Sequence, residues 1–365
     1  MNQNENQQTK LHFEISPETN TLSYESTRKY FTIIGFAFFV SSLVTMLTQY
    51  LSAVMVNIIA STVAPFLLST VESVSILGHL CSFIPIYCIG LPIFLKITQK
   101  LPKIKPLKQK MKFHHILAGL CICVALMISG NIASNNIMAF LEGLKGESIE
   151  NPVRTITSNS TFLINFVFVA IAAPILEEIF HRKIVCSRLL PLGEGWAVVI
   201  SAAAFSLAHE NLYQALYAFT LGLFFGFIYV KTGKLIYSIF YHFAVNFLGG
   251  VITPFLINQL DKISPDLYNR LLTETDMSWF MEMAPEQQAM FTIVYTLLTL
   301  HSLVLYGLAI VGGIILIVAA AKRKFTFESG LIPPVEKGKF SAFFLNAGVA
   351  ASIAYFAFRF IYSLV

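Results

Sequence analysis

The sequence predicts an all-α fold, a polytopic transmembrane helical bundle of about eight to nine membrane spans. Of the 365 residues, 56% are hydrophobic and only 12% are charged, whereas a soluble globular domain keeps about a quarter of its residues charged. The mean hydropathy is +0.69. Charged residues are absent from long uninterrupted stretches and are not thinned evenly along the chain. Side chains in such stretches must face lipid as well as a protein core, so the lipid bilayer is the first predicted partner.

Nine apolar runs are candidates to cross a bilayer, which needs about 20 residues per helix. They cover residues 30–59, 74–97, 113–141, 160–190, 196–211, 212–230, 235–258, 289–321 and 340–365. The segment before them, residues 1–29, is polar and of mixed charge, which predicts a cytoplasmic N-terminal tail and not a cleavable signal. We expect one transmembrane domain over residues 30–365.

The distribution of basic residues predicts the orientation of the spans. Lysine and arginine collect in the connections after the second and the eighth run, while the connections around 142–150 and 261–286 are acidic on balance. Short basic connections stay in the cytoplasm. Nine alternating spans then put the N-terminus inside and the C-terminus outside a cell (plasma) membrane. The net charge of +5 is accounted for by this topology, so we expect no nucleic-acid partner.

The fourth run contains ionisable residues from Glu177 to Arg182. Such groups are costly inside a membrane unless they are paired or hydrated. Glu178 and Arg182 are four residues apart and share a helix face, which predicts a supporting charge-assisted pair. Glu177 points about 100° away from that face, and a carboxylate without its own cation suits a base that takes a proton from water. The alternative is that these charges mark a cytoplasmic helix end among lipid headgroups.

The fifth run ends near His209, and the short connection 191–195 predicts that it lies antiparallel to the fourth run. Glu177 and His209 are equally far from this connection, at roughly 20 Å if the helix rises about 1.5 Å per residue. We therefore expect Glu177 and His209 to meet as the reacting pair. The alternative is a structural histidine whose hydrogen bonds are satisfied at a helix end.

The seventh run contributes His242 and Asn246, which are four residues apart and share a face. They offer a donor pair for an oxyanion, or His242 offers a metal ligand. By helical rise alone, His242 lies nearer the inner surface than His209, so a tilted helix or a late helix start is needed to bring them together. Between these two runs, the spacing of Gly222 and Gly226 predicts a helix packing face.

Three patterns now stand in order, each in its own span: Glu-Glu-x-x-x-Arg at 177–182, Phe-x-x-x-His at 205–209 and His-x-x-x-Asn at 242–246. Together they resemble the CPBP family, which comprises the prenyl-protein (CAAX) endopeptidases and the bacterial Abi or bacteriocin-processing proteins. The resemblance covers about 160–250. It implies an intramembrane endopeptidase with its catalytic core there, a cavity that opens toward the cytoplasm, and a peptide or protein substrate.

The resemblance also implies roles for individual residues. Glu177 and His209 would activate a water molecule, and His242 and Asn246 would stabilise the oxyanion of the tetrahedral intermediate. Both a metal-dependent and a metal-free glutamate mechanism are compatible with the sequence. In the metal-dependent case, a zinc ion would take Glu177, His209 and His242 as ligands and leave a fourth position for water.

Two other classes of function remain open. A non-catalytic membrane immunity or regulatory protein of the same fold would bind a partner through the same polar cavity. A transporter would also use charged groups inside the membrane, but the sequence contains neither an inverted repeat nor paired broken helices at corresponding positions. A matched carboxylate and imidazole inside lipid favour catalysis over both.

Overall fold

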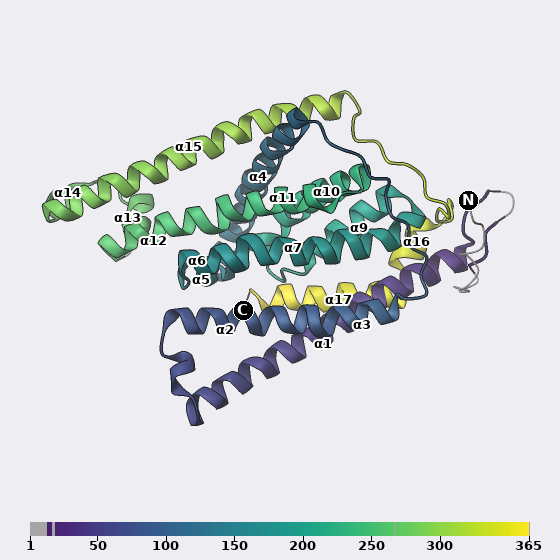
Figure 1. Ribbon diagram of the computed structural model, residues 1–365, viewed down its shortest axis with the longest axis horizontal. Helices are drawn as coiled ribbons and strands as arrows, with labels where there is room; N and C mark the ends of the chain where they lie inside the picture. Colours follow the sequence, from purple (N-terminus) through teal and green to yellow (C-terminus); the bar gives the residue numbers. More distant parts are fainter. Residues whose placement is uncertain (1–12, 17–18, 266, 365) are drawn as a thin grey trace.

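The computed structural model describes residues 13–16, 19–265 and 267–364, and within these ranges it is a helical bundle (Figure 1). Two isolated β-bridges occur in the described chain, but no strand does. The predicted all-α, polytopic fold is therefore confirmed. Residues 1–12 and 17–18 of the predicted tail lie outside the described residues.

Seven helical segments are long and apolar enough to cross a membrane. They are α1 (Tyr24–Thr62); α2 (Val71–Ile84) with η2 (Pro85–Gly90) and α3 (Leu91–Ile97); α4 (Phe113–Lys145); α6 (Phe162–Asn165) with η3 (Phe166–Ala172), α7 (Ala173–Glu178), η4 (Ile179–Cys186), α8 (Ser187–Leu189) and η5 (Leu190–Leu192); α10 (Leu212–Thr232); α11 (Leu235–Val245) with η6 (Asn246–Ile252) and α12 (Thr253–Ile263); and α15 (Pro285–Ala321). Two shorter apolar helices are α9 (Glu194–Leu207) and α17 (Ala347–Tyr362). The connections contain η1 (Pro65–Leu68), α5 (Pro152–Ser158), α13 (Leu267–Thr273), α14 (Ser278–Glu282) and α16 (Lys339–Phe344).

Each of the nine predicted runs is helical, but two of them are shorter than predicted. The fifth run becomes α9, which has 14 residues and ends before His209. The ninth run becomes α17, which has 16 residues and follows the separate turn of α16. The first helix instead begins early, inside the predicted tail, because the Ser23 hydroxyl caps it by accepting the Ser26 N–H at 3.2 Å.

The spans run back and forth between two ends of the molecule. The connections after α3, α10 and α15 gather at the end where α1 begins, and the small helices α5, α13 and α14 lie at the opposite end (Figure 1). Of the nine predicted spans, seven are long enough to cross a membrane, and α9 and α17 are shorter apolar helices. The basic connections thus share one end, and the assignment of that end to the cytoplasm remains a prediction from charge.

Lipid-facing and core-facing helices differ in burial. In the most apolar window of α15, only 11% of the residues are buried inside the protein, against 56% for α10. The α10 helix lies against α9 with little space between them, because a Cβ at Gly222 would come within 3.0 Å of the Ala202 Cα. The predicted glycine packing face is thus an α9–α10 interface, and it places the end of α9 deep in the bundle.

Candidate active site

The buried centre of the site is an ion pair between Glu178 and Arg182. The Arg182 Nε lies 3.1 Å from the Glu178 Oε2, and neither side chain is exposed. The predicted pairing of these residues is therefore present in the structure. Arg182 is held from the neighbouring helix α9, because its Nη1 donates to the Ser201 hydroxyl at 3.0 Å and its guanidinium lies over the Phe205 ring. A buried charge needs such partners, since its desolvation is otherwise uncompensated.

His242 connects the two adjacent carboxylates. Its Nδ1 lies 3.1 Å from the Glu178 Oε1, and its Nε2 lies 3.6 Å from the Glu177 Oε2. The imidazole stacks on the Phe225 ring at a centroid distance of 5.2 Å and meets the edge of Phe205. Packing of α11 against α7 therefore brings His242 to the carboxylates. Helical rise alone had placed His242 too near the inner surface for this contact.

His209 lies just beyond the end of α9, and its tautomer follows from one hydrogen bond. The Nδ1 lies 2.8 Å from the Phe205 carbonyl oxygen. A carbonyl only accepts, so the Nδ1 carries a proton, and a neutral His209 presents its Nε2 as an acceptor. His209 and Glu177 line the same two cavities. Across the described residues, no hydrogen bond or ion pair joins the two side chains, so the structure brings them to one space without direct contact.

Asn246 is the first residue of η6, one helical turn beyond His242. Its Nδ2 donates to the Val169 carbonyl oxygen at 2.9 Å, which orients the amide. An asparagine amide has two N–H groups, so one donor remains for a ligand. Two of the spans that carry the site have π-helical turns beside it, since η4 follows Glu178 and η6 starts at Asn246. Such π-turns frequently occur at functional sites.

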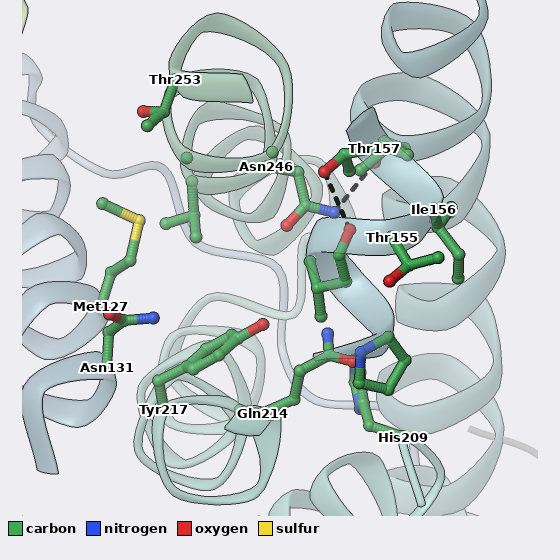
Figure 2. Close-up of a pocket in the computed structure, with 18 of the residues that line it drawn as sticks. Met127, Asn131, Thr155, Ile156, Thr157, His209, Gln214, Tyr217, Asn246 and Thr253 are labelled. Atoms are coloured by element: carbon green, nitrogen blue, oxygen red, sulfur yellow. Dashed lines mark hydrogen bonds between the residues drawn. The ribbon is translucent and has the colours of Figure 1, made fainter. Parts of the chain in front are cut away.

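A cavity of 1410 Å³ is lined by Glu177, His209, His242 and Asn246, among other residues. Figure 2 shows Tyr217 and Gln214 of α10 on one side of this space and Asn246 on the opposite side, with His209 beside Gln214. Typical small-ligand sites enclose about 300–1,000 Å³, so this cavity is large enough for a stretch of peptide. A second cavity of 320 Å³ meets Glu177 and His209 from the side of α1.

Several contacts at the site could not be predicted from the spacing of residues in the sequence. Ser201 lies in the middle of an apolar run, yet its hydroxyl accepts from Arg182 and donates to the His181 carbonyl oxygen at 2.9 Å. Glu210 likewise belongs to none of the three sequence patterns. The available signal was its charge, because an ionisable residue inside an apolar run marks a functional candidate.

A metal site would need several ligating side chains close together. In the described part of the chain, no three or more His, Cys, Asp or Glu side chains are grouped so as to hold a metal ion. The predicted ligand set of Glu177, His209 and His242 does not form such a group. Zinc remains a prediction, which metal analysis of the purified protein tests.

One comparison with known proteins covers this site. Residues 159–248 match the family model described as type II CAAX prenyl endopeptidase Rce1-like. The matched stretch contains every predicted site residue from Glu177 to Asn246 and confirms the resemblance to the CPBP family. Neither a curated protein nor a solved structure matches the chain.

Proposed function

We propose that this multi-pass membrane protein is an intramembrane endopeptidase that hydrolyses a peptide bond in a membrane-associated peptide or protein. The main support for this proposal is the difference between the surroundings of the adjacent carboxylates Glu177 and Glu178. Glu178 is fully buried and paired with Arg182, whereas the Glu177 side chain is 21% exposed and lines the cavity. The similarity of residues 159–248 to type II CAAX prenyl endopeptidases supports the same chemistry.

Glu177 acts as the general base in this proposal. A water molecule between Glu177 and His209 donates one hydrogen bond to the Glu177 carboxylate and one to the His209 Nε2. Glu177 takes a proton from this water as its oxygen attacks the carbonyl carbon of the substrate. The same proton then passes from Glu177 to the amine nitrogen as the C–N bond breaks, so the products are a carboxylic acid and an amine.

The negative charge of the intermediate forms on the former carbonyl oxygen. Two donors line the same cavity as the base and serve this charge: the second N–H of the Asn246 amide, and the Nε2–H of His242 in its imidazolium form, whose other N–H donates to Glu178. Donors placed before the reaction stabilise such an oxyanion without reorganisation. Glu178, paired with Arg182, accepts from the Nδ1 of His242 and so holds the imidazole toward Glu177.

Cleavage of a peptide library by the purified protein tests this function. We expect Glu177→Gln and His209→Ala to lower the cleavage rate by about 100-fold or more, since general acid–base groups contribute about 10²–10⁴-fold. Glu72→Gln, on the exposed first turn of α2, serves as the control carboxylate and should cleave normally. Cleavage by Glu177→Gln at the wild-type rate would refute the proposal.

Two further comparisons in the same assay address the mechanism and the substrate. Activity lost to a chelator and restored by zinc would favour a metal, whereas chelator-resistant activity favours Glu177 as the sole base. Prenylated and unprenylated versions of each cleaved peptide then establish whether the lipid is recognised. A non-catalytic immunity or regulatory protein would instead keep its cellular effect in Glu177→Gln.

A further inference from the structure

The residue after His209 has an uncommon backbone conformation. Glu210 lies in the turn between α9 and α10 with a φ of 53°. Positive φ is uncommon for residues other than glycine and is maintained only where the surroundings enforce it. The backbone of this turn also carries His209, so whatever holds Glu210 sets the position of the imidazole.

Two side chains of the C-terminal helix α17 hold the Glu210 carboxylate. The Tyr355 hydroxyl donates to Oε1 at 2.9 Å, and the Arg359 Nε donates to Oε2 at 2.7 Å. The Arg359 Nη2 lies 2.5 Å from the same oxygen. The side chains of Glu210 and Arg359 are 22% and 24% exposed, so water only partly screens the pair. Arg359 is the single charged residue in the sequence of α17, and a lone cation in an apolar helix requires a partner.

The α17 helix is itself firmly attached to α1. A Cβ at Gly348 would come within 2.1 Å of the Thr32 carbonyl oxygen, so the two helices touch backbone to backbone. The Tyr355 hydroxyl also lies 3.2 Å from the Ser42 carbonyl oxygen of α1. Glu210 is thus bound to a pair of helices, α1 and α17, that pack closely against each other.

We propose that Arg359 and Tyr355 are positioning residues, which hold the turn of His209 in its reacting geometry through Glu210. Both residues lie on the C-terminal helix α17, far outside the matched region, which ends at residue 248. The positioning role rests on the proposed peptidase function. The ion pair keeps the His209 Nε2 directed at the water that Glu177 activates.

Steady-state kinetics of the full-length protein with a cleaved peptide tests the inference. Arg359→Gln should lower kcat about tenfold, equivalent to about 1.4 kcal/mol, and leave KM within about twofold. Arg359→Lys keeps the charge and should restore most of kcat. Glu210→Gln with Arg359→Gln should be no slower than either single variant, because both remove the same interaction. Tyr355→Phe removes only one hydroxyl and should give a smaller loss in kcat.

A matched control lies at the other end of α9. Glu194 pairs with Lys231 at 2.5 Å, so Lys231→Gln removes an ion pair from the same helix without touching the His209 turn. Its kcat should equal that of the wild type. Hydrogen exchange of the amides of residues 208–211 provides a readout independent of activity. Arg359→Gln should speed this exchange, and Lys231→Gln should not.

The outcomes separate the two proposals. Normal kcat and normal exchange in Arg359→Gln, together with an inactive Glu177→Gln, would overturn the positioning role and leave the peptidase function standing. Equal losses of kcat in Arg359→Gln and Lys231→Gln would also overturn it, because they would indicate general loosening of α9. If Glu177→Gln remains active, the peptidase proposal fails. Faster exchange in Arg359→Gln would still show that Arg359 restrains the turn that contains His209 and Glu210.

Discussion

Two regions of the site are stabilised by different kinds of contact: the carboxylate centre, which is the ion pair of Glu178 and Arg182, and the His209 turn, which is residues 208–211. In the carboxylate centre, Glu178 and Arg182 are completely buried, and they come from one segment of chain. In the His209 turn, Glu210 and Arg359 are partly exposed and stand 149 residues apart in the sequence. The first region depends on local spacing and the second on the docking of a distant helix. A site whose motifs lie in a short core can therefore depend on a helix outside that core.

Removal of the buried cation should have the largest effect on stability. Arg182→Met leaves the buried Glu178 without its ion-pair partner, and breaking a buried pair costs about 3–5 kcal/mol. Unfolding of the purified protein by denaturant in mixed micelles measures this loss. Glu178→Gln combined with Arg182→Met removes both charges and should regain part of the stability. Wild-type stability in Arg182→Met would show that the buried ion pair does not stabilise the carboxylate centre.

Substitution of His242 should separate activity from stability within the same centre. His242→Phe keeps an aromatic ring against Phe225 but removes both nitrogens that face the carboxylates. We expect a fall in kcat of about 10²–10³-fold, as for the loss of an oxyanion donor. Asn246→Ala, which keeps His242, is the comparison variant and should lose less. Kinetics with a single peptide at saturating concentration gives both values, and normal turnover by His242→Phe would exclude it from the mechanism.

A change in the packing of α17 against α1 should have the smallest effect of the three on activity and stability. Gly348→Ala places a Cβ against the Thr32 carbonyl oxygen, and such overpacking typically costs about 1–3 kcal/mol. The α17 helix must then shift, so kcat should fall along with the unfolding midpoint. Gly307→Ala is the matched control, because nothing lies within 4 Å of the added atom. Unchanged kcat in Gly348→Ala would mean that the His209 turn does not depend on the position of α17.

The helices were largely predictable because their signal is local. Length and hydropathy identify the runs that become α1, α4, α10 and α15, since a bilayer imposes both properties on every span. Their exact ends were less predictable, because caps such as Ser23 act through single hydrogen bonds. The length of α9 was overestimated for a similar reason. The apolar run continues through His209, but the backbone turns at residues 208–211 where Glu210 is drawn toward α17.

Two features of the site follow from residue order alone: which ionisable groups lie within apolar runs, and which neighbours pair along one helix, such as Glu178 with Arg182. Spacing of four residues is enough for that, because helical geometry puts both side chains on one face. The position of His242 between Glu177 and Glu178, and the contact of Arg359 with Glu210, are visible only in the folded protein. These contacts join different helices, and their distances depend on tilt, rotation and close backbone approach. Those quantities arise from packing over the whole bundle and leave no periodic pattern in any one segment.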